Sequence, residues 1–255
     1  MKNYKKELEQ HLKDLHLPTI RSIYDEAGEK AAAEGLDYSE YLLELARSES
    51  ESRRDRRTER WLRESQLPLE KNLESFEMKR MPKQVIHQAK VLQEGSFLDR
   101  NENILAFGSP GSGKTHLLCG IGQHLVYQGR RIYYTSCGLL VQELLRAKKD
   151  LKLDKILKKL SRYEGLIIDD IGYVQHSREE MEVLFTLLAQ RYERGSVIIT
   201  SNLPFSEWES IFKDPMTTAA AIDRLVHHCV ILELNVPSFR MQHAKKNVKE
   251  QKDVE

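Results

Sequence analysis

The sequence predicts an α/β protein in which a parallel β-sheet is covered by helices on both faces. Segments of helical pattern alternate with five apolar runs that we expect to be strands, at 103–107, 131–135, 165–169, 196–200 and 230–234. Strands that are apolar on both faces and separated by helices are typical of a parallel sheet between two helical layers. Residues 1 to about 64 read as helix throughout, so we expect a small all-helical part before the sheet.

Composition and cysteine usage restrict the class of protein. The 255 residues are 40% hydrophobic and 31% charged, with a net charge of +1, which suits one α/β domain with a smaller appendage. No apolar run approaches the roughly 20 residues that a membrane span needs, and residues 1–10 lack the apolar core of a secretory signal. Cys119, Cys137 and Cys229 lie far apart and form no metal-binding CxxC pair. We therefore expect a cytoplasmic protein with reduced thiols and no membrane partner.

Prolines and a helix-capping residue predict how the chain divides into parts. Pro68 and Pro82 bracket a connecting segment, and Asp37 or Ser39 is placed to cap the helix that carries the later part of the N-terminal region. The predicted parts are a helical N-terminal domain (1–66) for DNA contact and assembly, a linker (67–82), a core (83–240) and a basic polar tail (241–255).

An arginine-rich stretch ends the N-terminal domain. Residues 47–63 contain seven arginines and four acids. At helical spacing one face would carry Arg53, Arg56, Arg57, Arg60 and Arg63. Because phosphate backbones favour rows of arginine, this face is a candidate surface for duplex DNA. A solvated face with neighbouring ion pairs, such as Arg47 with Glu51, is the alternative. Residues 148–159 form a second basic cluster, with six lysines and two acids.

The first predicted strand leads into a glycine-rich loop with the pattern Gly-x-x-x-x-Gly-Lys-Thr, which is the P-loop pattern. The loop and the start of the next helix comprise Gly108, Ser109, Pro110, Gly111, Ser112, Gly113, Lys114, Thr115 and His116. Its backbone amides and the helix N-terminus can hold phosphates. Lys114 should reach the β- and γ-phosphates, and the Thr115 hydroxyl should bind Mg²⁺. The alternative is a glycine turn that matches by chance, but a strand before it and a helix after it favour a nucleoside triphosphate site.

Polar side chains end two further predicted strands. Asp169 and Asp170 follow the strand at 165–169, and Asn202 follows the strand at 196–200. Since the carboxyl ends of parallel strands share an edge of the sheet, Asp169 can face the Mg²⁺ held by Thr115. Asp170 can then orient or deprotonate the attacking water, and Asn202 can hold that water or the γ-phosphate. The alternative in both places is an ordinary turn.

A helical stretch before the last strand contains Arg224. An arginine there can act as a finger that reaches the γ-phosphate bound by a neighbouring subunit. A local salt bridge with Asp223 or Asp214 is the alternative. We interpret the neighbouring His227 and His228 as structural, because the sequence around them shows no metal-ligand pattern.

With these residues in view, the chain resembles the IstB family, the ATP-binding helper proteins of insertion-sequence transposition. Besides the P-loop, the resemblance rests on Ile-Asp-Asp-Ile-Gly-Tyr, Arg-Tyr-Glu, Thr-Ser-Asn, Asp-Arg-Leu-Val-His-His and Ser-Phe-Arg, at 168–173, 191–193, 200–202, 223–228 and 238–240. The family belongs, with DnaC-type helicase loaders, to the AAA+ ATPases. The resemblance implies an AAA+-type P-loop NTPase fold with a five-stranded parallel sheet.

The resemblance also implies roles for particular residues. Gly108 to Thr115 would be Walker A, Asp169 and Asp170 Walker B, Asn202 sensor 1, Arg224 the arginine finger and Arg240 a sensor-2-like arginine. ATP and Mg²⁺ would be the cofactors. Family members self-associate into an oligomer in the ATP state, bind duplex DNA with little sequence preference and engage the transposase encoded beside them.

Two departures from the AAA+ pattern keep other functions open. Walker B usually ends Asp-Glu, and the shorter Asp170 predicts slow turnover, because a catalytic base is sensitive to displacements of about 1 Å. The chain also ends soon after the last strand, so we expect no full C-terminal lid domain. The leading hypothesis is a DNA-dependent ATPase that assists a transposase. The alternatives are a DnaC-like loader of a replicative helicase and a nucleotide-gated DNA-binding scaffold with negligible hydrolysis.

Overall fold

The computed structural model describes residues 2–172, 177–212 and 214–239, and it divides into two compact units, Met1–Arg60 and Trp61–Glu255. The first unit is entirely helical, as expected. It contains α1 (Lys2–Asp14), α2 (Pro18–Glu34) and most of α3 (Tyr38–Ser65), whose last residues belong to the second unit. Asp37 caps α3, since its carboxylate accepts hydrogen bonds from the amides of Ser39 and Glu40 at 2.7 and 2.8 Å.

A buried carboxylate organises the first unit. Glu49 on α3 is only 4% exposed, and it accepts hydrogen bonds from the backbone amides of Thr19 and Ile20 at the first turn of α2. Burial would raise the pKa of Glu49, but the hydrogen bond from Arg53 and those from the two amides outweigh it and lower this pKa. Arg56 adds a second guanidinium at 3.6 Å. Glu49 therefore fastens the N-terminus of α2 to α3.

The second unit is an α/β sandwich around five parallel strands. The strands are β1 (Asn103–Phe107), β2 (Ile132–Ser136), β3 (Gly165–Ile171), β4 (Ser196–Ser201) and β5 (Cys229–Glu233), and their order in the sheet is β2-β3-β4-β1-β5. All five predicted strands are present to within a residue or two at each end. The expected fold class, a five-stranded parallel sheet flanked by helices, is confirmed.

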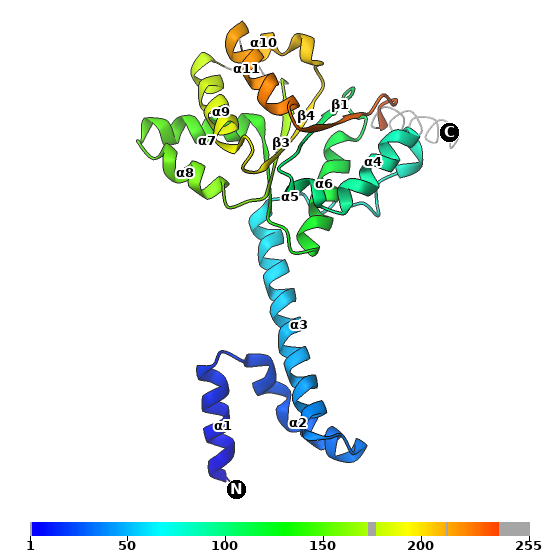
Figure 1. The fold of residues 1–255 in the computed structure, drawn as a ribbon, viewed down its shortest axis with the longest axis vertical. Coiled ribbons are helices and arrows are strands. Elements are labelled where there is room, and N and C mark those ends of the chain that lie inside the picture. Colours follow the sequence, from blue (N-terminus) through cyan, green and yellow to red (C-terminus); the bar gives the residue numbers. More distant parts are fainter. Residues whose placement is uncertain (1, 173–176, 213, 240–255) are drawn as a thin grey trace, which may run out of the picture. The chain divides into compact units, whose positions relative to one another are not determined.

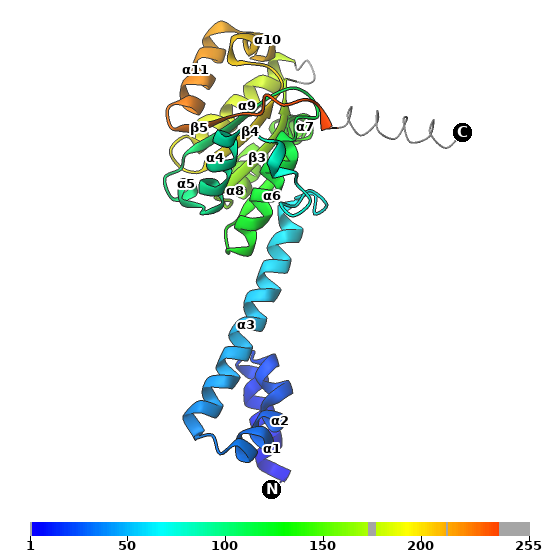
Figure 2. The same ribbon diagram turned by 90° about the vertical axis from the view of Figure 1, so that its right-hand side faces the viewer.

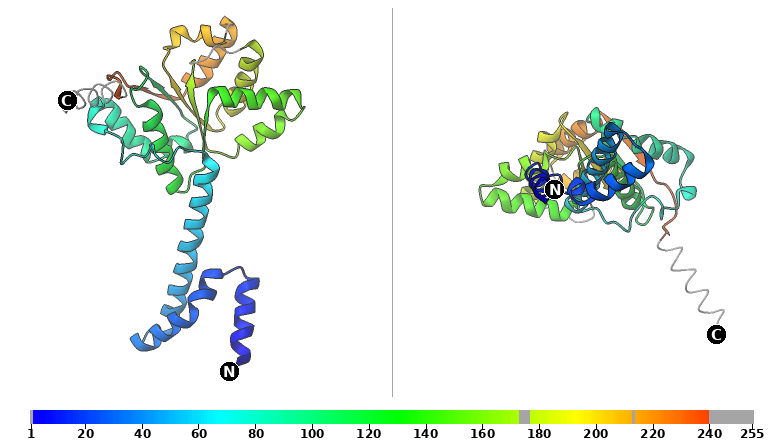
Figure 3. Two further views of the ribbon diagram at one scale, coloured as in Figure 1. Left: turned by 180° about the vertical axis from the view of Figure 1, so that it is seen from behind. Right: turned by 90° about the horizontal axis from the view of Figure 1, so that it is seen from below.

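Two helical layers cover the sheet (Figure 1). One contains α4 (Lys83–Gln93), the short α5 (Ser96–Asp99) and α6 (Lys114–Tyr127), and Figure 2 views it face-on. The other contains α7 (Cys137–Lys149), α8 (Leu153–Leu160), α9 (Arg178–Arg191), α10 (Glu209–Phe212) and α11 (Pro215–Val226). Figure 3 shows both layers from behind, with the sheet between them. The apolar core is correspondingly split into two clusters, one on each face. No helix within the described residues is long and apolar enough to cross a membrane.

A buried arginine ties the second layer to the sheet. Arg191 ends α9 and is 3% exposed. Its guanidinium donates to four backbone carbonyls, those of Leu160, Tyr163, Glu164 and Ser196, at 3.0–3.1 Å. Burial lowers the pKa of Arg191 to about 10, and four charge-assisted hydrogen bonds offset the cost of burying its charge.

The predicted linker is packed onto the core. The side-chain amide of Gln123 on α6 donates to the carbonyls of Pro68 and Lys71 at 2.9 and 3.2 Å. Leu73 lies so close to Gly120 of the same helix that an added Cβ would meet its side chain at 2.9 Å. The segment 67–82 therefore forms part of the folded second unit and includes a short 3₁₀ turn at Met78–Arg80. The functional division into the four predicted parts stays a prediction.

Candidate nucleotide-binding site

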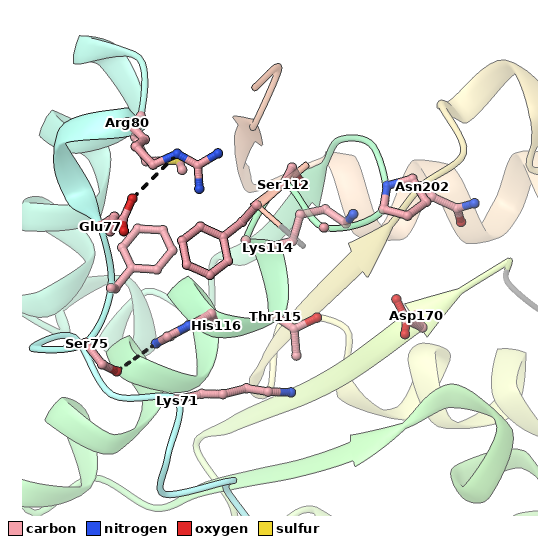
Figure 4. A pocket seen from close by; sticks show the side chains of 16 residues that line it. Lys71, Ser75, Glu77, Arg80, Ser112, Lys114, Thr115, His116, Asp170 and Asn202 are labelled. Atoms are coloured by element: carbon pink, nitrogen blue, oxygen red, sulfur yellow. Dashed lines mark hydrogen bonds and ion pairs between the residues drawn. The ribbon is translucent and has the colours of Figure 1, made fainter. Parts of the chain in front are cut away.

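A pocket of about 520 Å³ lies at the carboxyl edge of the sheet, where β1, β3 and β4 end (Figure 4). Seven of the nine predicted P-loop residues line it: Pro110, Gly111, Ser112, Gly113, Lys114, Thr115 and His116. Asp170 from β3 and Asn202, just after β4, line it too. The structure thus brings together the motifs that the sequence placed at the ends of three separate strands.

The P-loop is wrapped around the amine of Lys114. This side chain is 6% exposed, and its Nζ donates to the carbonyls of Gly108 and Ser109 at 2.7 and 3.1 Å. Gly108 and Ser109, the two predicted loop residues that do not line the pocket, therefore contribute to the site by holding the Lys114 amine. A buried ammonium at the N-terminus of α6 makes this end of the pocket electropositive, as an anionic phosphate requires.

Asp169 is the centre of a hydrogen-bonded cluster below the pocket. It is 5% exposed, and its Oδ1 accepts from the hydroxyls of Thr115 at 2.8 Å and Thr200 at 2.6 Å. Its Oδ2 accepts from the Tyr134 hydroxyl at 2.9 Å. Burial and the charge of Asp169 both raise the pKa of Tyr134 far above its usual range, so the phenol stays protonated and donates. Three donors hold the carboxylate in one orientation, and sequence reasoning missed two of them, Tyr134 and Thr200.

Asp170 reaches the pocket because the strand is irregular there. The pairing of β3 with β4 shifts register between Ile168 and Ile171, and Asp170 has a φ of +58°. Its amide donates to the Thr200 hydroxyl at 2.8 Å, which fixes this conformation. Asp adopts positive φ more readily than most residues with a side chain. The bulge turns the Asp170 side chain out of the sheet to an exposed position on the pocket wall.

The opposite wall was not predicted. It comes from the supposed linker, which contributes Lys71, Ser75, Phe76, Glu77, Arg80 and Met81. Phe76 packs edge-on against the His116 ring at a centroid distance of 5.2 Å, and a Cβ on Gly113 would meet its ring at 3.0 Å. His116 also lies 2.9 Å from the carbonyl of Asn72, so it joins the segment to α6. The apolar residues between Pro68 and Pro82 were the available signal that this segment is packed.

The segment that follows β5, residues 234–239, contacts the P-loop. The Phe239 amide donates to the carbonyl of Gly111 at 2.9 Å, and the Arg80 guanidinium donates to the carbonyl of Pro237 at 3.1 Å. Arg80 also lies 4.9 Å from the centre of the Phe239 ring, which lines the pocket. The Ser-Phe-Arg motif therefore begins at the nucleotide pocket, while Arg240 itself lies outside the described residues.

Arg224 lies away from the nucleotide pocket. It is on α11, and the carbonyls of Arg224 and Leu225 accept from the Asn103 side chain at the start of β1, the edge of the sheet opposite the P-loop. Its guanidinium donates to the carbonyl of Ala220 and lies 4.7 Å from the Phe185 ring centre. Arg224 therefore does not line the nucleotide pocket of its own chain, and its predicted role as a finger requires a second subunit.

The five arginines of the candidate DNA surface are all exposed on α3. Arg53 and Arg56 have contacts within the first unit. Arg53 donates to Glu49 at 2.9 Å and to the carbonyl of His16, and Arg56 donates to the Thr19 hydroxyl at 3.1 Å. The structure therefore adds a structural role for Arg53 and Arg56. DNA contact stays a prediction for all five arginines.

The pocket residues fit a phosphate and a magnesium ion. The Ser112 hydroxyl is buried among the P-loop amides and has no hydrogen-bond partner within the described part of the chain. A phosphate oxygen would satisfy it. Thr115 and Asp169 place a hydroxyl and a carboxylate oxygen 2.8 Å apart, and hard oxygen donors are what Mg²⁺ binds.

Comparisons with known proteins agree with this geometry. Residues 10–247 match the model of the family described as IstB-like ATP binding protein. The chain is 43% identical to an insertion-sequence ATP-binding protein of Sinorhizobium fredii, over 91% of this chain and 78% of that protein. It is 34% identical to the corresponding protein of the insertion sequence IS5376 of Geobacillus stearothermophilus, over 98% and 99% of the two chains. For the IS21 protein of Pseudomonas aeruginosa the identity is 35%, over 94% and 91%.

Solved structures show the same fold at lower identity. The DnaC helicase loader superposes with a TM-score of 0.52 at 19% identity, covering 59% of this chain and 88% of that one. The replication initiator DnaA bound to AMPPCP and single-stranded DNA gives a TM-score of 0.57 at 20% identity, covering 72% and 56%. These similarities show that the chain shares its fold with these proteins.

Proposed function

The chain belongs to the IstB-like ATP-binding protein family, and we propose that it is an ATPase that assembles on duplex DNA and assists a transposase. The observation that carries this proposal is the convergence of Lys114, Thr115 and Asp170 in one pocket at the carboxyl edge of the sheet, with the buried Asp169 hydrogen-bonded to Thr115. A helix N-terminus, a buried amine and two carboxylates at that edge suit the binding and hydrolysis of a nucleoside triphosphate.

In this proposal each side chain of the site has a task. The P-loop amides and Lys114 bind the β- and γ-phosphates, and Thr115 with Asp169 holds Mg²⁺, which would neutralise charge on the phosphate oxygens. Asp170 orients the attacking water or takes its proton, and Asn202 positions the water or the γ-phosphate. Phe76, on the wall formed by residues 71–81, and His116, which packs against it from α6, offer ring surface to the base.

The remaining parts act outside the pocket of the single chain. Arg224 lies at the far edge of the sheet, so it reaches a γ-phosphate only in an oligomer, as the proposed finger acting between subunits. The exposed arginines of α3 bind the phosphate backbone of duplex DNA with little sequence preference. The relatives are named as proteins of insertion sequences, which supports a cytoplasmic role beside the transposase of such an element.

Asp170 favours a second candidate function, a nucleotide-gated DNA-binding scaffold with negligible hydrolysis. Its side chain is one methylene shorter than the Glu usual at this position of Walker B. The positive φ of +58° and the hydrogen bond to Thr200 fix the backbone position from which this shorter side chain extends. If it falls short of the attacking water, the protein binds ATP and assembles without turning it over.

Hydrolysis measured with and without random-sequence duplex DNA separates the two functions. We expect ATP turnover that rises with DNA and falls by about 100-fold in Asp170→Asn, the contribution typical of a general base. Asp150→Asn, at an exposed position after α7, is the matched control and should leave turnover unchanged. Turnover that is absent with and without DNA would contradict the ATPase proposal and favour the scaffold, whereas equal turnover in Asp170→Asn would contradict the catalytic role of Asp170.

A further inference from the structure

We propose that Glu193, His227 and His228 form a binding site for a zinc-class divalent metal ion, apart from the nucleotide pocket. One ligand atom from each residue lies within 4.8 Å of the others, and within the described residues no other group of three such side chains is this close. Glu193 comes from the turn between α9 and β4, and the histidines come from the turn between α11 and β5. The proposal differs from the interpretation of the two histidines as structural, which considered only their neighbours along the chain.

The backbone of all three residues is fixed by the fold. Glu193 has a φ of +57°, and its carbonyl accepts from the Asn101 side chain at 3.0 Å. The carbonyl of His228 accepts from the Asn103 amide at 2.8 Å, and the His227 amide donates to the carbonyl of Asp223 at 3.0 Å. Because these backbone contacts hold the three residues in place, rotation of their exposed side chains would bring the ligand atoms closer together. Such preorganisation lowers the entropic cost of binding.

A tyrosine supports one of the imidazoles. The Tyr192 hydroxyl lies 3.0 Å from Nδ1 of His227, and the His227 and His228 rings are 4.2 Å apart between centroids. When Nδ1–H donates to the Tyr192 oxygen, Nε2 of His227 carries the lone pair that a metal takes. A hydrogen-bond partner on the other ring nitrogen is the usual arrangement for a metal-binding histidine, because it fixes the tautomer and the ring orientation.

The cavity beside the cluster leaves room for further ligands. Its volume is about 240 Å³, and it is lined by Arg100, Asn101, Tyr192, Glu193, Arg224 and His228. Two imidazoles and one carboxylate are the donor set of open zinc sites, in which water completes the coordination. Mg²⁺ and Ca²⁺ prefer oxygen ligands, so this set favours Zn²⁺ or a neighbouring transition metal.

Arg100 and Arg224 repel a cation in this cavity only weakly, because both guanidinium groups have partners of their own. Arg100 forms a two-pronged pair with Glu102, with both N–O distances 2.8 Å. Arg224 faces the Phe185 ring and the carbonyl of Ala220. The charge of Glu193 therefore remains as the local attraction for a divalent ion, and bound metal would join two turns that are 34 residues apart in sequence. The proposal does not depend on nucleotide binding.

Zinc binding to the full chain, freed of any affinity tag and without nucleotide, tests the site. We would titrate Zn²⁺ against a chromogenic chelator and record the visible absorption of Co²⁺ as a probe of tetrahedral coordination. One ion should bind per chain, with affinity lowered at least about tenfold in Glu193→Gln and further in His227→Ala/His228→Ala. Tyr192→Phe should keep the stoichiometry and weaken the affinity. His87→Ala, an exposed histidine on α4, should bind like the wild type.

Circular dichroism of each variant separates loss of the site from loss of the fold. Should the double histidine variant misfold, Glu193→Gln decides, because it keeps the shape of the side chain. Absence of binding by the wild type at about 100 µM zinc, or an unchanged bound ion in folded Glu193→Gln, would overturn the proposal.

Discussion

Thr200→Val should uncouple the two acidic residues of the site while leaving the fold intact. Thr200 is fully buried on β4, and its hydroxyl contacts both residues: it donates to Asp169 at 2.6 Å and accepts from the amide of Asp170 at 2.8 Å. Valine has nearly the same shape but can make neither bond. Thr200→Ser keeps both and is the matched control.

The expected loss of stability follows from those two bonds. A hydrogen bond to a charged group contributes about 1.5–3 kcal/mol, and an amide left unsatisfied costs about 1–3 kcal/mol. Valine recovers part of this because no hydroxyl is desolvated. We therefore expect the free energy of unfolding to fall by about 2–4 kcal/mol in the valine variant and by less than about 1 kcal/mol in the serine variant.

Turnover should fall more than stability explains. Without the Thr200 bond the bulge at Asp170 loosens, and a catalytic group misplaced by about 1 Å can cost roughly 100-fold in rate. Nucleotide affinity, which depends on Lys114 and the P-loop, should change little. Urea unfolding, binding of a fluorescent ATP analogue and steady-state hydrolysis measure the three quantities. If the valine and serine variants unfold and turn over alike, the Thr200 hydroxyl does not position the acidic pair.

Four further substitutions test separate parts of the account. Lys114→Ala should abolish nucleotide-dependent assembly, measured by light scattering, and unchanged assembly would remove the P-loop from the mechanism. Phe76→Ala should weaken binding of a fluorescent ATP analogue by about tenfold through lost ring contact, whereas unaltered affinity would exclude the 71–81 wall from base binding. Arg224→Ala should keep ATP binding but lose hydrolysis or assembly; equal activity would leave Arg224 only its contacts within α11 and with Phe185. Arg191→Met should lower the free energy of unfolding by about 3–5 kcal/mol in urea, since four buried carbonyls lose their donor, and a loss below about 1 kcal/mol would refute the structural role.

The fold could be predicted because its signals are local. Each strand is a short apolar run bounded by helical segments, and the P-loop pattern fixes which strand carries the phosphate site. The same reasoning placed Asp169, Asp170 and Asn202 at one edge, since parallel strands end on the same side. The structure then brought these three residues and Lys114 to one place.

The rest of the site depends on contacts between segments distant in sequence. Tyr134 and Thr200 support Asp169 from neighbouring strands, and no spacing rule marks them in advance. Pro68 and Pro82 bracket the predicted connecting segment, but the sequence did not show that the residues between them pack on α6 and line the pocket. For the α3 arginines, helical periodicity predicts that they share one face of the helix. It cannot show that Arg53 also donates a hydrogen bond to Glu49.

The most direct test of the central claim is the size of particles formed on long random-sequence duplex DNA with ATP, with ADP and with neither. We predict large complexes with ATP alone, and none in Lys114→Ala. DNA binding in every nucleotide state with equal particle size would contradict the nucleotide-driven assembly. Absence of DNA binding in all three states would contradict the role on duplex DNA and favour a loader that grips a helicase instead.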